Sequence, residues 1–160
     1  MAEKNDPMTG ELTLTRVFNA PRTLVFDAWT DAKHVAQWWG PHRFTNPVCE
    51  IEARAGGRIN IHMRGADGTT HVTQGAFVEF VRPEKLVFIN NARDLNGTLL
   101  LEGVTTVLFA DEGGKTRMTL HTRAKGHVPM APMMLKGMEM GWSQSLERLA
   151  AVAAALQTAR

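Results

Sequence analysis

Hydrophobic and polar residues alternate with a period of two through most of the first three quarters of the chain, which is typical of β-strands. Sequences rich in glycine, proline, asparagine and aspartate separate these stretches and indicate tight turns. We therefore expect an antiparallel meander. The predicted strands cover residues 12–18, 48–54, 58–64, 70–81, 86–90, 99–109 and 116–123.

Between the first and second predicted strands the period changes to that of two short helices. Pro21 suits a first helical turn, where its missing N–H would have no partner, and apolar residues over 24–29 share one helical face. Asp31 is a suitable N-cap for the second helix, which Gly40 and Pro41 end.

The last part of the chain has the periodicity of one long helix. From Met133 to Leu156 apolar residues recur every third or fourth position, with Gly137 and Gly141 near the start as places for a bend or a close approach. An antiparallel sheet has one face to cover, and this helix is the element long enough to cover it. We predict an α+β fold in which a curved seven-stranded sheet wraps around the C-terminal helix.

Composition and charge are those of an ordinary globular domain. The chain is 44% hydrophobic and 21% charged, which excludes a disordered chain, and its net charge of +2 does not favour nucleic acid as a partner. Cys49 is the single cysteine, so no internal disulfide is possible. We expect no membrane-spanning segment and a cytoplasmic location, with residues 1–10 as a flexible lead-in and 11–158 as one domain.

Several short motifs resemble those of a known family. The chain contains RVFNAP at 16–21, VFDAWTD at 25–31 and QWWGP at 37–41, followed by a glycine pair at 56–57, PEKLVF at 83–88, GW at 141–142 and LERL at 146–149. Together they resemble the family related to the activator of the heat-shock protein 90 ATPase, in the START-like (SRPBCC) helix-grip superfamily. The resemblance covers residues 11–158 and implies a helix-grip fold with a deep apolar cavity for hydrophobic small molecules.

Candidate ligand-binding residues follow from the alternation along the strands and the apolar face of the last helix. Ile59, Ile61 and Met63 share one sheet face, and five of the nine methionines lie between residues 130 and 140, which would give a cavity wall an adaptable surface. The alternative is a plain packed core. The residues that we expect to line the cavity are Trp38, Met63, Phe88, Met118, Met134, Met138 and Trp142.

Ionisable side chains give no catalytic constellation in the sequence. Alternation directs His62 and His121 outward, and a hairpin that turned at Asp67 and Gly68 would place His71 opposite His62. We expect Cys49 to be a small buried hydrophobe, and we expect neither a metal site nor a cofactor. The acidic candidates are spread over three predicted strands, with the first two expected to face solvent: Glu50, Glu52, Glu79 and Glu102.

Three classes of function are compatible with the sequence. The first is a module that binds a small hydrophobic or aromatic molecule under the long helix. The second is an enzyme of the cyclase or hydrolase kind known in the superfamily, which would need an ionisable group inside the cavity. The third is a chaperone-interaction protein, by analogy with the ATPase activator. We favour binding over catalysis, and a homodimer formed through a sheet edge stays an open alternative.

Overall fold

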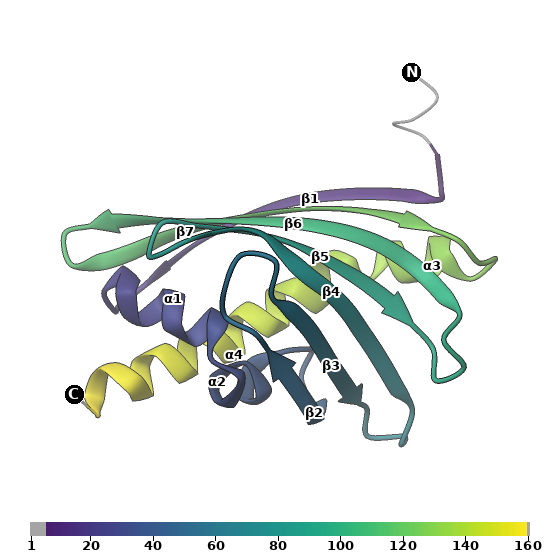
Figure 1. Cartoon of the computed structure of the whole chain (residues 1–160), viewed down its shortest axis with the longest axis horizontal. Helices are drawn as coiled ribbons and strands as arrows, with labels where there is room; N and C mark the ends of the chain where they lie inside the picture. Colours follow the sequence, from purple (N-terminus) through teal and green to yellow (C-terminus); the bar gives the residue numbers. More distant parts are fainter. Residues whose placement is uncertain (1–5, 160) are drawn as a thin grey trace.

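A strongly curved antiparallel sheet arches over a long helix in the computed structural model, which describes residues 6–159 (Figure 1). The seven strands lie in the order β1-β7-β6-β5-β4-β3-β2. Their bounds are β1 Thr9–Phe18, β2 Thr45–Ile51, β3 Arg58–Arg64, β4 Thr70–Val81, β5 Lys85–Arg93, β6 Leu99–Glu112 and β7 Lys115–Gly126.

The helices all lie on the concave side of this sheet. α1 and α2 connect β1 to β2, and α4 passes beneath the sheet with α3 at its start (Figure 1). The arrangement confirms the predicted α+β fold, because a sheet with one apolar face must bury it against other elements. The helices are α1 Arg22–Thr30, α2 Ala32–Trp38, α3 Ala131–Lys136 and α4 Met138–Thr158.

β3 and β4 have the predicted bounds, whereas the other five strands begin or end at different residues. β1 begins at Thr9, so the last two residues of the predicted lead-in over 1–10 already pair with β7, while residues 1–5 lie outside the described part. β2 ends at Ile51 and not at residue 54. Beyond it, the N–H groups of Arg54 and Gly57 donate to the carbonyls of Glu52 and Arg54, and these local turn bonds replace a strand ladder.

The predicted C-terminal helix is divided in two at Gly137. The N–H of Gly137 donates to both Met133 and Met134 carbonyls, and glycine favours a helix interior less than alanine by about 1 kcal/mol. α3 therefore ends there and α4 continues for 21 residues. The sequence predicted a bend at this glycine but not two separate helices.

Strand register confirms most of the predicted inward residues and corrects one pair. Ile59 and Ile61 are buried, as are Met118 and Leu120 on β7. His71 pairs with Met63 and not with His62, because Gly65 and Thr69 close a five-residue connection between Arg64 and Thr70. A one-residue shift moves a side chain to the other face, so His71 lies on the concave side, with its ring centroid 5.9 Å from that of Phe44.

Candidate functional site

All four tryptophans of the chain lie in one cluster on the concave side of the sheet. Ring centroids are 4.7 Å apart for Trp29 and Trp38, 6.1 Å for Trp29 and Trp142, and 5.5 Å for Trp39 and Trp142. Trp29 and Trp38 are buried, and both indole N–H groups are bonded: Trp29 donates to Met118 Sδ at 3.2 Å, and Trp38 donates to a main-chain carbonyl of α1 at 2.8 Å. Trp29 and Trp38 therefore belong to the packed core and have no free N–H donor for a ligand.

Trp39 and Trp142 differ from that pair because both are half-buried. Neither indole N–H has a hydrogen-bond partner among residues 6–159. Trp39 also borders a cavity of about 10 Å³, which is close to the space that one water molecule needs. A larger guest therefore requires side-chain movement at this place. The cavity is lined by Trp29, Val35, Trp39, Ile51, Ile59, Ile61, Phe77 and Phe88.

A chain of polar side chains crosses the concave face next to the cluster. Thr105 Oγ1 donates its one hydrogen to Asn90 Oδ1 at 2.9 Å. The two hydroxyl oxygens of Thr105 and Thr122 are also 2.9 Å apart, so the hydrogen between them comes from Thr122. Both threonines are buried, whereas Asn90 is half-buried. This series of hydrogen-bonded side chains therefore ends at the side-chain amide of Asn90.

Small residues surround Asn90 on this face. Gly75 pairs with Asn90, Gly103 pairs with Ala124, and Ala124 pairs with Gly10, which places small residues on four neighbouring or nearby strands. A Cβ on Gly103 would lie 2.7 Å from the carbonyl oxygen of Asn90, so a larger side chain does not fit there. This part of the concave face therefore carries few side-chain atoms above the backbone of the sheet.

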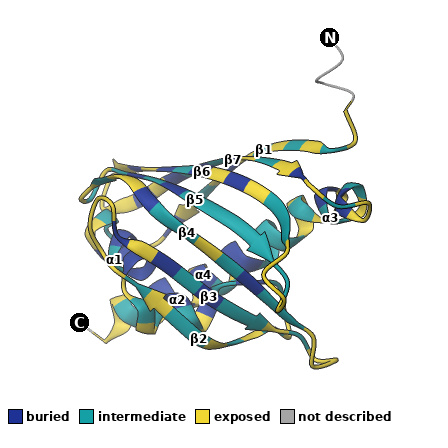
Figure 2. Cartoon of the chain, turned by 45° about the vertical axis from the view of Figure 1, so that its right-hand side comes forward, coloured by how far each residue is buried: buried dark blue, intermediate teal, exposed yellow. Residues whose placement is uncertain are grey.

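The concave face has two regions that differ in how completely the helices cover them. The packed end comprises the buried apolar residues beneath α1, α2 and the second half of α4. The half-buried end comprises the concave residues that these helices leave partly accessible, and Figure 2 shows the continuous half-buried stretch of β5 that belongs to it. Its sheet residues include Gly10, His71, Thr73, Gly75, Asn90, Ala92, Leu101 and Ala124.

The seven predicted ligand residues are divided between these regions. Trp38, Phe88 and Met118 are buried in the packed end. Met63 is half-buried near the end of β3, where its Sδ is the atom closest to the Cβ position of Gly40. The three remaining residues come from the helices and are half-buried: Met134, Met138 and Trp142.

Five residues of the tryptophan cluster and of the adjoining polar side chains were missing from the predicted set: Trp29, Trp39, Asn90, Thr105 and Thr122. Alternation could have found Asn90, because it lies two positions after Phe88 on the same face of β5. It could also have found Thr105, which alternates with the buried Val107 and Phe109. The contact between Thr105 and Thr122 depends on the register of β6 and β7, which no local pattern shows.

The ionisable side chains considered in the sequence lie mainly outside the concave face. Glu50, Glu52, Glu79 and Glu102 are all exposed, and Glu102 pairs with His127. Cys49 packs half-buried against the core, and burial raises the pKa of its thiol to about 11. Within residues 6–159, no group of three or more histidine, cysteine, aspartate or glutamate side chains is placed to hold a metal ion. No helix in that range is both long and apolar enough to cross a bilayer.

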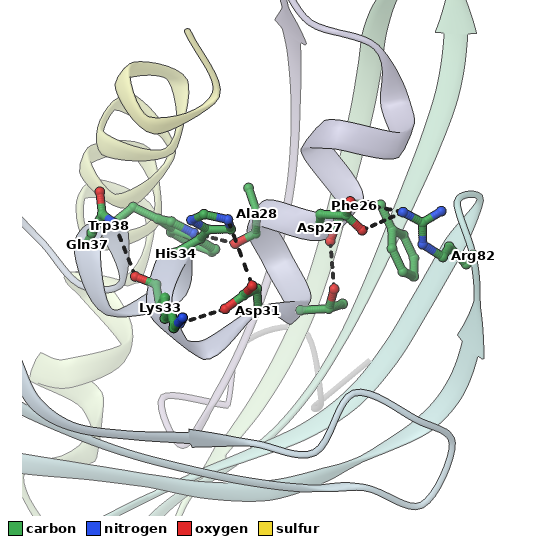
Figure 3. Close-up of polar contacts among 10 residues, drawn as sticks. Phe26, Asp27, Ala28, Asp31, Lys33, His34, Gln37, Trp38 and Arg82 are labelled. Atoms are coloured by element: carbon green, nitrogen blue, oxygen red, sulfur yellow. Dashed lines mark hydrogen bonds and ion pairs between the residues drawn. The ribbon is translucent and has the colours of Figure 1, made fainter. Parts of the chain in front are cut away.

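A separate pocket of about 390 Å³ lies beside α1. Arg82 Nη2 contacts both carboxylate oxygens of Asp27 there, at 2.7 and 2.9 Å (Figure 3). Both side chains are about half exposed, so water screens the ion pair. The pocket shares no residue with the half-buried end, and it is lined by Thr23, Leu24, Asp27, His34, Arg82 and Leu156.

Comparison with known proteins places this architecture among relatives. The family model described as Activator of Hsp90 ATPase homolog 1-like protein matches residues 19–154. A crystal structure of a protein from Chromobacterium violaceum is 27% identical, with a TM-score of 0.79 over 90% of this chain and 96% of that one. A solution structure from Arthrobacter aurescens is 26% identical, with a TM-score of 0.76 over 90% and 86% of the two chains. Comparison with curated proteins gives no match.

Proposed function

Because the chain belongs to the family of Activator of Hsp90 ATPase homolog 1-like proteins, whose START-like fold commonly binds ligands, we propose that it binds a small apolar or aromatic molecule. The site is the half-buried end of the concave face, beneath the start of α4. The observation that carries the proposal is the state of Trp39 and Trp142, which are half-buried next to two fully buried tryptophans.

Aromatic side chains that stay half-buried beside a packed core offer unused apolar surface. A ligand ring that covers Trp142 would remove this surface from water, which stabilises a complex by about 25 cal/mol per Å² of apolar area. Aromatic pairs add roughly 0.5–1.5 kcal/mol when the rings stack or meet edge to face. Met134 and Met138 supply flexible neighbours that fit ligands of different shape.

Binding is better supported than catalysis. Acid–base chemistry needs an ionisable group within hydrogen-bond reach of the substrate. The carboxylates that the sequence offered are exposed, and Asn90, Thr105 and Thr122 have no acid or base function near neutral pH. His71 is the ionisable side chain on the concave side of β4, and it lies four positions along that strand from Gly75, the partner of Asn90, with its ring beside Phe44. No contact among the described residues favours the chaperone-interaction alternative.

Tryptophan fluorescence tests the proposal directly. The chain has no tyrosine, so emission excited at long wavelength comes from the four clustered tryptophans. We expect saturable quenching on titration with 2-ethylnaphthalene. Trp142→Ala should weaken the affinity by about ten-fold, which corresponds to roughly 1.4 kcal/mol.

Leu95→Ala is the matched control, because Leu95 is 68% exposed in the turn between β5 and β6. Its affinity for 2-ethylnaphthalene should equal that of the wild type. The proposal is wrong if the wild-type protein shows no saturable binding, or if the Trp142 and Leu95 variants lose affinity equally.

A further inference from the structure

We infer that the molecule bound at the half-buried end carries an uncharged hydrogen-bond acceptor, such as the carbonyl of a ketone, aldehyde or ester, which the side-chain amide of Asn90 binds. The inference rests on the proposed function and adds the chemical class of the ligand. It comes from the direction of the hydrogen bonds on the concave face.

The hydroxyl hydrogens of the polar chain all point toward Asn90. Thr122 donates to Thr105, and Thr105 donates to Asn90 Oδ1. The amide oxygen is thereby occupied, and the bond from Thr105 sets the orientation of the amide. Asn90 Nδ2 retains two N–H donors, and neither has an acceptor among residues 6–159. The position therefore offers donors to a ligand.

Asn90 follows a member of the aromatic cluster along β5. Phe88 precedes it by two positions on the same face of β5, and two residues of a strand span about 6.6 Å. The Phe88 ring centroid is 6.0 Å from that of Trp29, which in turn stacks on Trp142. A ligand that extends from the aromatic cluster along β5 would therefore meet the side-chain amide of Asn90.

The neighbours of Asn90 favour a neutral acceptor over a carboxylate. The residues around it on the concave face are Gly75, Gly103 and Ala124, and none of them carries a charge. Two side chains that can carry a positive charge lie on the concave side, Arg16 on β1 and His71 on β4. Arg16 already donates to Thr15 O and lies 3.5 Å from Ser143 Oγ, and His71 lies four positions along β4 from Gly75, the partner of Asn90. A carboxylate would lose hydration without an ion-pair partner, which is costly, whereas a carbonyl needs one or two N–H donors.

Two probes of similar shape test this inference: 2-ethylnaphthalene, which has no acceptor, and 2-acetonaphthone, which has a ketone oxygen. We measure the dissociation constants of both by calorimetry for the wild type and for Asn90→Leu, and compare the ratio of the two constants. One buried hydrogen bond contributes about 1 kcal/mol. The substitution should therefore shift the ratio against 2-acetonaphthone by about five-fold.

Asn90→Asp is the second variant, because it keeps the size of the side chain and replaces the two donors by an acceptor. It should shift the ratio in the same direction. Asn60→Ala on the convex face is the control and should leave the ratio unchanged; its amide contacts Glu50 and Gln74 instead. Thermal unfolding of each variant verifies that it is folded.

The outcomes separate the two proposals. Failure of both probes to bind the wild type overturns the proposed function. Binding of both probes with a ratio that neither Asn90 variant changes overturns the role of Asn90 and leaves the aromatic site standing. The inference is supported if both Asn90 variants lose the preference for 2-acetonaphthone over 2-ethylnaphthalene and Asn60→Ala keeps it.

Discussion

The two ends of the concave face are built from the same strands but differ in what covers them. At the packed end the ring of Phe26 on α1 meets Phe80 and Phe109 edge to face, with centroids 5.2 and 5.3 Å apart. At the half-buried end β5 loses the alternation of buried and accessible residues and is half-buried at every position from Ile89 to Arg93. The helices α1 and α2 cover only the first region.

This difference shows how one sheet can provide both stability and a binding surface. Large apolar side chains fill the packed end, where their burial supplies most of the hydrophobic free energy. Glycine, alanine and a hydrogen-bonded amide occupy the half-buried end, where Gly75 and Gly103 carry no side chain and a Cβ at either position would collide with the backbone of β5. Substitutions at the two ends should therefore have different costs.

The largest effect is expected at the centre of the packed end. Phe26→Ala removes a fully buried ring that contacts two other rings. The free energy of unfolding should fall by about 4 kcal/mol, from lost burial and the cavity left behind. Urea unfolding measures it, with Leu95→Ala as the exposed control at under about 0.5 kcal/mol. A loss below about 1 kcal/mol for Phe26→Ala would mean that this end is not tightly packed.

Arg148 joins α4 to the segment that carries Trp39, so its removal should affect both ends. Its Nη1 donates to the carbonyls of Trp39, Gly40 and Pro41 at 3.1, 2.9 and 3.1 Å, and its Nη2 donates to that of Gln37 at 2.9 Å. Burial lowers the pKa of its guanidinium, which nevertheless stays charged at neutral pH.

Arg148→Met should lower the free energy of unfolding by about 2–3 kcal/mol, because it leaves several carbonyls without their charged donor. It should also weaken binding of 2-ethylnaphthalene, since Trp39 loses its anchor. Arg123→Met on the exposed side of β7 is the control. Equal unfolding midpoints for the two variants would show that the carbonyl contacts of Arg148 contribute nothing.

The packed end was more predictable from the sequence than the half-buried end. Alternation and helical periodicity depend on burial, so Ile59 and Ile61 were correctly placed on the inner face of the sheet. The Thr105–Thr122 contact depends on register across two strands, and the position of His71 depends on the length of one turn. Local patterns do not fix either of them, because a shift of one residue reverses the face of a strand.

The predicted binding residues show the same limit. Hydrophobic character selected Trp38 and Phe88, which the structure buries in the core, as readily as Trp142, which it leaves half-buried. A pattern of apolar residues identifies the face of an element but not how completely other elements cover it. Only the placement of α1 and α2 over one end separates the two groups.

A matched pair of leucines tests the comparison with the same chemical change. Leu120 is fully buried at the packed end, whereas Leu101 is half-buried at the other end. Leu120→Ala should cost about 3 kcal/mol and Leu101→Ala about 1 kcal/mol, because less burial is lost at an accessible position. Equal losses in urea unfolding would mean that the two ends are packed alike and would remove the basis of the comparison.

The smallest effect concerns β1, the edge strand that carries Gly10 into the half-buried end. Glu11 on β1 lies 2.6 Å from His121 Nε2 on β7, and this hydrogen bond, helped by the charge of Arg123, lowers the pKa of the Glu11 carboxyl below its ordinary value of 4.5. A lowered pKa in the folded state stabilises the protein above that ordinary value, and the contribution is lost as the pH falls through the lowered pKa. The pair is solvent-exposed, so the effect should be small and should shrink in 1 M salt.

Glu11→Gln should therefore lower the melting temperature slightly at pH 6 and not at pH 3. Glu84→Gln, in the exposed turn between β4 and β5, is the control. A Glu11→Gln difference that is the same at both pH values would show that ionised Glu11 does not hold the edge strand.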